Sequence, residues 1–405
     1  MKKTPGVIVL GDHVQALGIL RSLGRRGVPV YLMHDDNFCI GRFSRYTNRF
    51  IKTPIFGNES AFVDYLIKFS DKNHVGDWIL IPTNDMAVEL LSKNKKILEE
   101  NYRVPTPSWD TIKFALNKKL TYTVANERGI PIPLTIYPKD EAELSELMTE
   151  VTFPVVVKPA VAHHFWYKVG VKMYKAKSPT ELMEKYKDAS RILDPSEIMI
   201  QELIPGDLTS LYTLGSFFKD GRLLAVWTGK KIRQRPMDFG NCTFAISEWE
   251  PQLVEMGTDF LSAINYYGLS ELEIKKDSRD GVFKLIEMNA RTWLWHSLAI
   301  KCGVDFPYLL YKDMIGGDEN PLTTFQENIK WMHIYTDLGI MAKEVLRGNM
   351  KLREYLSTLS GKKDFSVLSR DDPLPFIGET LLLPYLWLSR SAYGWKHERQ
   401  GGKSI

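Results

Sequence analysis

The chain has 405 residues, of which 44% are hydrophobic and 25% are charged, the composition of a globular protein with room for two or three domains. Its formal net charge of +4 is too small to indicate binding to nucleic acid. The three cysteines are scattered and show no metal-binding spacing, so we expect buried thiols in a reducing compartment, the cytoplasm.

Residues 1–109 alternate between apolar runs and segments with helical period. Strands are predicted at 7–10, 28–33 and 77–82, and helices at 14–23, 61–70 and 86–100. This alternation favours an α/β domain, in which helices cover the faces of a parallel sheet. The spacing of Gly6, Gly11 and Gly18 is not that of the G-x-G-x-x-G fingerprint, so no dinucleotide site is predicted.

A proline-containing break at 102–111 separates this domain from a second one, predicted at 110–329. Helices are predicted here at 110–128, 140–150 and 178–189, and strands at 153–160, 198–204 and on both sides of the Asp220-Gly221 turn. This mixture indicates an α+β domain with antiparallel sheets. A mainly helical C-terminal region is predicted at 330–405.

The C-terminal region carries the nearest candidate for a membrane span, residues 374–388, but Glu379 and Pro384 interrupt this short run. We therefore expect no transmembrane segment and predict a packed terminal helix. The alternative is peripheral contact between the basic tail, Arg390 to Lys403, and a membrane surface. The sequence leaves the oligomeric state open, and a homodimer is compatible with it.

The segment GLSELEIKKDSRDGVFKLIEMNAR, residues 268–291, is predicted to form a β-hairpin. Asp280-Gly281 marks its turn, and a three-residue loop over 279–281 would place Gly281 in the left-handed conformation that such loops favour.

Counting back from this loop puts Glu273 opposite Glu287, and Glu271 opposite Asn289, on one face of the hairpin. The other face would carry four apolar residues that suit a core: Leu272, Ile274, Ile286 and Met288.

Juxtaposed acids need a counter-charge, because like charges directly across a ladder are destabilising. Carboxylate oxygens are the ligands that Mg²⁺ prefers, so the hairpin favours a Mg²⁺ site between the acids. The alternative is a solvated polar face on which Lys275 and Lys284 supply the counter-charge.

Basic side chains gather in the segment 227–245. If this segment is extended, Lys231, Arg233 and Arg235 share one face, an arrangement that suits phosphates and carboxylates. Glycines at 229 and 240 would let the segment move as a lid, and the alternative is a solvated charged loop.

Lys158 follows four apolar residues at the end of the strand at 153–160. Its ammonium either enters a cleft at the strand end or extends from a sheet edge into water. Neither a Walker-type phosphate loop nor a G-x-S-x-G motif is present, so a nucleophilic hydrolase has no visible centre.

Five segments in a fixed order resemble the ATP-grasp superfamily. They are Lys118 ahead of GIPIP, then FPVVVKP, IQELIPG, LEI and LIEMNAR, within roughly residues 110 to 310. Two further stretches, KKIRQRP…FG and NARTWLWHSLAIKCGVDFP, are similar to carboxylate–amine ligases near the D-aspartate ligase type. The resemblance implies a Rossmann-like α/β domain ahead of an α+β ATP-grasp fold, followed by the helical C-terminal region.

The resemblance also implies roles for individual residues. It assigns the phosphates of ATP to Lys118 and Lys158. It assigns adenine to a hinge segment formed by Glu202, Leu203 and Ile204, with Gln201 adjacent to it. It assigns Mg²⁺, with Mn²⁺ as the alternative ion, to Glu273, Glu287 and Asn289. It assigns the acyl phosphate to Arg291 together with Arg233 or Lys231.

One segment departs from the family pattern. The family commonly has a glycine-rich loop over the phosphates after Lys158, whereas this chain has PAVAHHFWYKVGVK, with Gly170 as its one glycine. Lys168 or Lys172 would replace the backbone contacts. His163 and His164 in this segment have no partner at zinc spacing and are predicted to be loop residues.

The implied function is an ATP-dependent ligase that joins a carboxylate to an amine of an amino acid or peptide and releases ADP and phosphate. The alternatives are a carboxylase or acid–thiol ligase on the same fold, and a nucleotide-binding regulatory protein without turnover. Substrate contacts are expected near Asp85, at 163–168 and around Trp295. Asp85 either contacts the amine or caps its helix.

Overall fold

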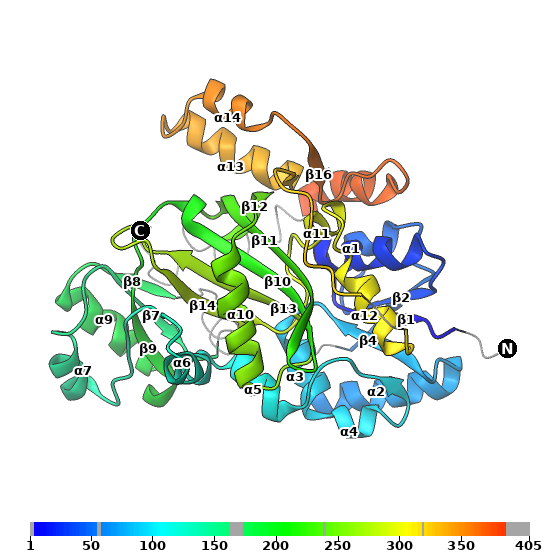
Figure 1. Cartoon of the computed structure of the whole chain (residues 1–405), viewed down its shortest axis with the longest axis horizontal. Coiled ribbons are helices and arrows are strands. Elements are labelled where there is room, and N and C mark those ends of the chain that lie inside the picture. Colours follow the sequence, from blue (N-terminus) through cyan, green and yellow to red (C-terminus); the bar gives the residue numbers. More distant parts are fainter. Residues whose placement is uncertain (1–3, 55–57, 162–172, 238–239, 318–319, 386–405) are drawn as a thin grey trace.

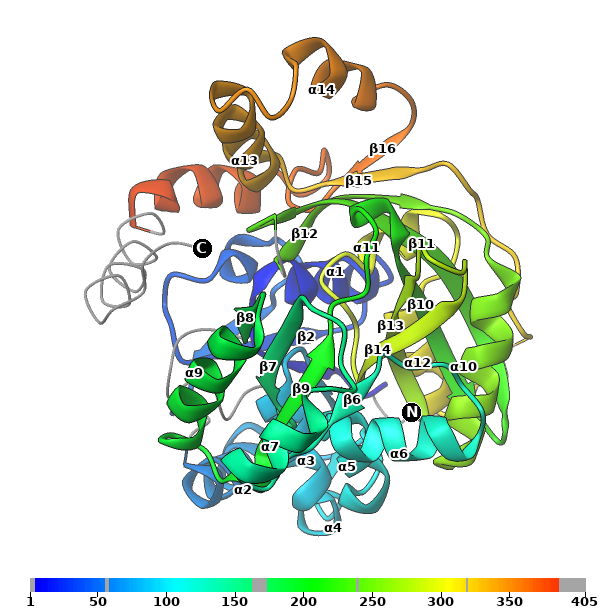
Figure 2. The same cartoon turned by 90° about the vertical axis from the view of Figure 1, so that its left-hand side faces the viewer.

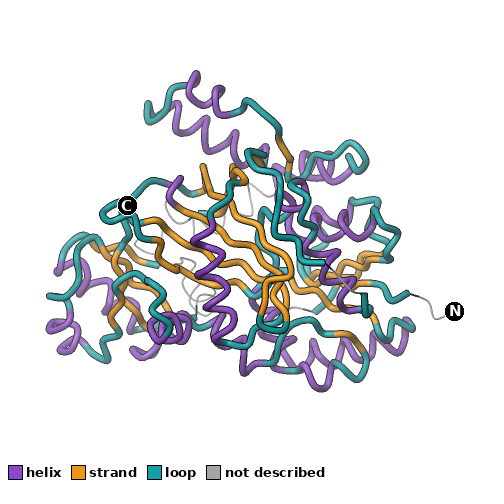
Figure 3. Tube along the Cα trace, in the orientation of Figure 1, coloured by secondary structure: helices purple, strands orange, loops and turns teal. Residues whose placement is uncertain are grey.

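The structure is a computed structural model, which describes residues 4–54, 58–161, 173–237, 240–317 and 320–385 (Figure 1). Three sheets of five, four and seven strands organise this part of the chain. The largest sheet lies in the middle, with helices around it (Figure 3). This architecture confirms the predicted combination of a parallel sheet with antiparallel sheets.

The N-terminal sheet is parallel throughout, in the order β3-β2-β1-β4-β5. Its strands are β1 (Val7–Leu10), β2 (Val30–His34), β3 (Arg49–Lys52), β4 (Trp78–Pro82) and β5 (Tyr102–Arg103). Its helices are α1 (His13–Gly24), η1 (Ile40–Phe43), α2 (Glu59–Asn73), α3 (Asp85–Lys93) and α4 (Lys95–Leu98). Val7 and Val9 pack with α1, whereas Ile8 and Leu10 pack with α2 and α3, so β1 is buried on both faces.

The four-stranded sheet is antiparallel, in the order β6-β9-β7-β8. Its strands are β6 (Thr135–Ile136), β7 (Val155–Pro159), β8 (Tyr174–Ala176) and β9 (Ile198–Glu202). Helices α7 (Glu141–Leu147) and α9 (Pro179–Ser190) pack on it, as Figure 2 shows. The short helix η2 (Pro195–Glu197) leads into β9, and η3 (Leu208–Ser210) leads out of the sheet.

The single helix predicted at 110–128 is in fact two helices, α5 (Trp109–Leu116) and α6 (Lys118–Glu127). Asn117 separates them, because its side chain accepts hydrogen bonds from the first backbone N–H groups of α6 and caps that helix. The break puts Lys118 at the first position of α6. Its backbone N–H donates to the carbonyl of Ala160 at 2.9 Å, next to strand β7.

The seven-stranded sheet has the order β14-β13-β10-β11-β12-β15-β16. Its strands are β10 (Leu211–Lys219), β11 (Arg222–Arg235), β12 (Asn241–Ser247), β13 (Gly268–Lys276), β14 (Phe283–Asn289), β15 (Lys330–Met332) and β16 (Lys363–Phe365). Helix α10 (Pro251–Ala263) crosses one face (Figure 1). It approaches the sheet closely at Gly257, where a Cβ atom would lie 2.1 Å from Leu214.

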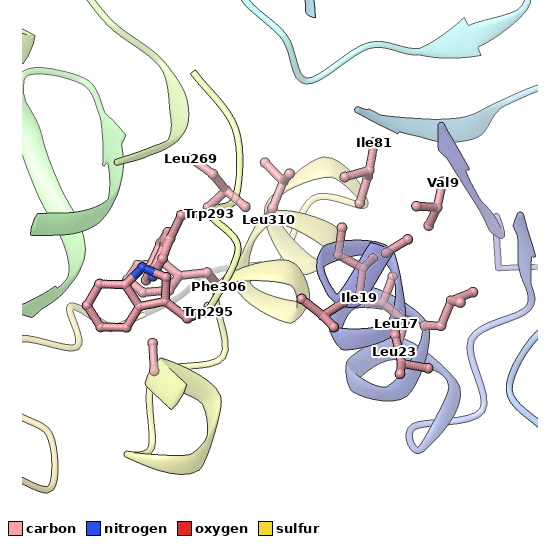
Figure 4. Close-up of a cluster of buried hydrophobic side chains, with 14 of the residues drawn as sticks. Val9, Leu17, Ile19, Leu23, Ile81, Leu269, Trp293, Trp295, Phe306 and Leu310 are labelled. Atoms are coloured by element: carbon pink, nitrogen blue, oxygen red, sulfur yellow. The ribbon is translucent and has the colours of Figure 1, made fainter. Parts of the chain in front are cut away.

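The other face of this sheet packs against helix α1 and the parallel five-stranded sheet through one continuous core. Trp293, Trp295 and Phe306 lie between the sheet and helix α1, which contributes Leu17 and Leu23 (Figure 4). Helices α11 (Ser297–Lys301) and α12 (Phe306–Met314) complete this layer. Both tryptophans are buried, since each is 1% exposed.

The C-terminal region contains helices α13 (Ile334–Leu346) and α14 (Leu352–Thr358), and residues 374–385 are also helical. It also supplies β15 and β16, so this region, which was predicted to be mainly helical, extends the large sheet. No helix in the described part of the chain is both long and apolar enough to span a membrane. The basic tail predicted to contact a membrane, Arg390 to Lys403, lies outside the described residues.

Candidate active site

A cleft of about 930 Å³ opens between the four-stranded sheet, the seven-stranded sheet and the start of helix α1. The predicted site residues that line it come from six separate parts of the chain: Lys118, Lys158, Gln201, Glu202, Leu203, Ile204, Lys231, Glu273, Glu287, Asn289 and Arg291. Arg233 is the predicted site residue that does not line it.

The acidic face of the hairpin β13–β14 is as predicted. Glu273 is opposite Glu287, and Glu271 is opposite Asn289. The loop is not as predicted, because Asp277 pairs with Val282 and the loop therefore has one residue more.

A β-bulge after Glu273 compensates for this longer loop. The bulged residue is Ile286, which lines the cleft, while Leu285 takes the core position opposite Ile274. The prediction that Ile286 faces the core is therefore wrong.

Two lysines form ion pairs with the juxtaposed acids. Lys231 Nζ lies 2.8 Å from Glu273 Oε1, and Lys118 Nζ lies 2.7 Å from Glu287 Oε2. Burial lowers the pKa of both ammonium groups, but the nearby carboxylates outweigh burial and raise each pKa above its ordinary value. The acids thus hold both lysines in the charged form.

Lys158 enters the cleft, so its interpretation as a strand-edge charge in water is wrong. It is 6% exposed, and its Nζ donates a hydrogen bond of 2.7 Å to Gln201 Oε1. Burial, and then the charge of Lys118, lowers the pKa of Lys158 to about 7.

The side chain of Glu202 is bound to protein groups on all sides. Its carboxylate accepts hydrogen bonds from the backbone N–H of Leu134, from Arg279 and from Lys284. The alternative interpretation of Lys284 as counter-charge for the acidic face is therefore wrong. Gln201 is likewise bonded to Lys158 and Thr135, so both side chains already have partners within the protein.

Arg233 points away from the cleft. A bulge between Lys231 and Arg233 breaks the strand alternation, so these two residues do not share a face as predicted. Both oxygens of the Asp337 carboxylate accept hydrogen bonds of 2.8 Å from the guanidinium, and both side chains are at most 2% exposed. Arg233 therefore anchors helix α13 to the sheet, and Lys231 is the basic residue of this segment that reaches the acids.

The segment 227–245, for which a lid and a solvated charged loop were the alternatives, is largely strand. Gly229 lies inside β11, paired with Thr213 on one side and Ser247 on the other, so it is not a hinge. The segment that replaces the glycine-rich loop, with His163, His164, Lys168, Gly170 and Lys172, lies outside the described residues except at its start.

Arg291, after strand β14, is paired with Asp85 at the start of helix α3 and with Asn289. Its Nε donates to Asp85 Oδ1 at 2.7 Å, and its Nη2 donates to Asn289 Oδ1 at 3.0 Å. Asp85 does not cap helix α3, because Asn84 accepts the hydrogen bond from Ala87 N at 2.9 Å. The sequence indicated neither this pairing nor the cap.

Two residues of helix α1, His13 and Gln15, line the cleft and were not predicted. They follow β1 directly, and ligands of open α/β sheets bind outside the carboxyl ends of the strands. Their position directly after the first strand could therefore have predicted that they line a binding site.

Glu271 is a further acid of the cleft. It is 3% exposed, and burial, followed by repulsion from Glu273, raises the pKa of its carboxyl to about 8.

In the part of the chain that the structure describes, no group of three or more His, Cys, Asp and Glu side chains could hold a metal ion. A cation at Glu273 and Glu287 would need other oxygens, which Asn289 and the phosphates of a ligand can supply.

No family model matches the chain. It is 25% identical over 303 residues to D-aspartate ligase of Enterococcus faecium (strain Aus0004), a match that covers 70% of each chain. It is 27% identical over 207 residues to D-alanine--D-alanine ligase of Pseudomonas fluorescens (strain Pf0-1), over 48% of this chain and 61% of that relative.

Solved structures show the same fold. The L-amino acid ligase from Bacillus licheniformis superposes with a TM-score of 0.62 at 18% identity, over 79% of this chain and 76% of that one. N5-carboxyaminoimidazole synthetase from Staphylococcus aureus, complexed with ADP, gives a TM-score of 0.60 at 14% identity, over 81% of both chains. In fold and in sequence, the chain is therefore similar to ATP-grasp ligases that join a carboxylate to an amine.

Proposed function

We propose that the chain uses ATP to activate the carboxylate of an amino acid and joins it to an amine, with release of ADP and phosphate. The observation that carries this proposal is the pair of facing acids, Glu273 and Glu287, with Lys231 and Lys118 beside them. Acids alternating with cations in one cleft suit a nucleotide's phosphates and their counter-ion. The relationship to D-aspartate ligase supports an amino acid or a peptide as substrate.

The donor set fits Mg²⁺, with Mn²⁺ as the alternative ion. Glu273, Glu287 and Asn289 offer oxygen atoms only, and the ion site is completed when phosphate oxygens are present. When bound, the ion neutralises charge that develops on the transferred phosphoryl group. Lys118 and Lys158 would bind the phosphates once the acids exchange their lysine partners for the cation.

The reaction proceeds in two displacements. A carboxylate oxygen attacks the terminal phosphorus of ATP, and the bond to ADP breaks. The amine then attacks the acyl carbon, the amide bond forms, and phosphate leaves with the bridging oxygen while the nitrogen loses a proton. Lys231 and Arg291 would stabilise the negative charge at the acyl phosphate, because both line the cleft next to the acids.

The adenine would lie against the backbone of Glu202 to Ile204, since the side chain of Glu202 is held by protein groups. The amino acid would lie near His13, Gln15 and Arg291, which also line the cleft. Asp85 holds the Arg291 guanidinium there, so Asp85 would act on the substrate through Arg291.

The test is ADP release from purified protein with Mg-ATP and a panel of amino acids, offered as carboxylate and as amine. We expect ADP only when both substrates are present, together with a product whose mass is that of an amide. Absence of ADP for every pair would contradict the proposal. ADP release that depends on bicarbonate would instead indicate a carboxylase, and ADP release that depends on a thiol would indicate an acid–thiol ligase. Nucleotide binding without any turnover would indicate a regulatory protein.

Because the pKa of Lys158 is lowered, we expect the protein to take up a proton when a nucleotide binds. Its pKa is about 7 in the ligand-free cleft, and nearby phosphates would raise that pKa, so the complex binds more protons than the free protein. We expect proton uptake at pH 8 and an ADP affinity that falls as the pH rises above 7, by at most about tenfold per pH unit. Isothermal titration calorimetry in buffers of different ionisation enthalpy measures this uptake.

The control exploits the permanent charge of arginine. Lys158→Arg should remove the proton uptake, because a guanidinium stays protonated in both states. Lys187→Arg, on the exposed side of α9, should leave it unchanged. Wild-type protein that binds ADP at pH 8 without proton uptake would refute the prediction.

A further inference from the structure

The carboxamide of Asn289 lies between two groups of opposite hydrogen-bonding character. Glu271, directly opposite on β13, accepts a hydrogen bond of 3.0 Å from Asn289 Nδ2. Arg291 donates a hydrogen bond of 3.0 Å to Asn289 Oδ1. The two ends of a carboxamide have nearly the same shape, but one end donates and the other accepts. These neighbours therefore select one of its two orientations.

Glu271 is itself held in place. Its other oxygen, Oε1, is 3.1 Å from the hydroxyl of Thr213 on β10, and its side chain is almost fully buried. The arrangement does not depend on the protonation of Glu271. The ionised carboxylate accepts from both neighbours, and the protonated acid donates to the Thr213 hydroxyl and still accepts from Asn289.

The orientation matters because only the oxygen of a carboxamide can bind Mg²⁺. Glu273 and Glu287 are the other two protein ligands of the proposed site, and both are paired with lysines. A reversed Asn289 would present its NH₂ group to the ion, and the site would lose one of its three protein oxygens.

We propose that Glu271 is a positioning residue, which holds the Asn289 carboxamide with its oxygen available to the divalent ion. This proposal rests on the proposed function, and it adds a residue that touches neither the ion nor the nucleotide. Replacing a residue that hydrogen-bonds to a metal ligand commonly lowers the metal affinity about 10–100-fold.

The test compares Glu271→Leu with wild-type protein. Leucine has a similar size but cannot accept a hydrogen bond, so Asn289 loses the partner that fixes its NH₂ end. We expect the affinity for Mn²⁺ in the presence of ADP, measured from the electron paramagnetic resonance signal of free Mn²⁺, to fall about 10–100-fold. The affinity for ADP without metal should stay within about twofold, which a general loss of structure would not allow.

Three further variants separate positioning from packing. Glu271→Gln can still present an oxygen to Asn289 Nδ2 and should recover most of the Mn²⁺ affinity. In an Asn289→Asp background, where both ends of the side chain are oxygens, Glu271→Leu should cause no loss. Ser270→Ala removes a neighbouring buried hydrogen bond, to Ser216, and should leave Mn²⁺ affinity unchanged.

The proposal is overturned if Glu271→Leu binds Mn²⁺ with ADP as tightly as wild type. If that variant does not fold, Glu271→Asp replaces it, because aspartate keeps the carboxyl group but withdraws it by one methylene from Asn289. Unchanged Mn²⁺ affinity in Glu271→Asp overturns the proposal equally. Failure of the proposed function looks different, since wild-type protein itself would then bind no Mn²⁺ with ADP.

Discussion

Replacement of Glu287 by glutamine should lower substrate-dependent ADP formation about 10³-fold, which corresponds to roughly 4 kcal/mol of lost transition-state stabilisation. Glu287 faces Glu273 across the ladder and lies 2.7 Å from Lys118. Glutamine keeps the shape and one oxygen but removes the charge, so the proposed ion loses an anionic ligand and Lys118 loses its carboxylate partner. Steady-state ADP release with both substrates present measures the effect.

Glu248→Gln is the matched control. Glu248 pairs with Lys230 at 2.6 Å on the same sheet, and its side chain is 34% exposed, against 30% for Glu287. It does not line the cleft, so its loss should cost at most about 1 kcal/mol of stability and leave turnover unchanged. Turnover in Glu287→Gln within tenfold of wild type would contradict the assignment of Glu287 to the ion.

The position of the acidic pairs could be predicted because strand alternation and a glycine turn fix the register of a short hairpin. Glu273 and Glu287 are opposite each other as counted from the sequence. The prediction succeeded although the loop was taken one residue too short, because the bulge at Ile286 restored the register. Nothing in the sequence marks that bulge, which depends on how the strands pair and twist.

The same kind of irregularity led to the wrong prediction for Arg233. Alternation predicts that residues two apart share a face, and the bulge in β11 turns Arg233 away from Lys231. Contacts between segments that are distant in the chain could also not be predicted from the sequence. Arg291 and Asp85 are 206 residues apart, and the strands β15 and β16 join the sheet from a region whose composition indicates helices. Local patterns carry no information about such pairings.

Replacement of Arg233 by methionine should destabilise the protein by about 3–5 kcal/mol, because it leaves the buried carboxylate of Asp337 without its cation. Thr243 and Tyr355 would still donate hydrogen bonds to that carboxylate, but neither carries a charge. The guanidinium also stacks 4.0 Å from the ring of Phe244, a contact that methionine only partly replaces. Urea unfolding measures the change in free energy.

The catalytic and the structural interpretation of Arg233 predict different outcomes. In the structural case, kcat and the KM for ATP of the folded Arg233→Met protein, measured at low temperature, stay within a few-fold of wild type. The double variant Arg233→Met/Asp337→Leu removes both charges and should regain most of the lost stability, because no uncompensated charge remains buried. A stable Arg233→Met protein with kcat reduced about 10²-fold or more would instead place Arg233 at the acyl phosphate, as the sequence resemblance implied.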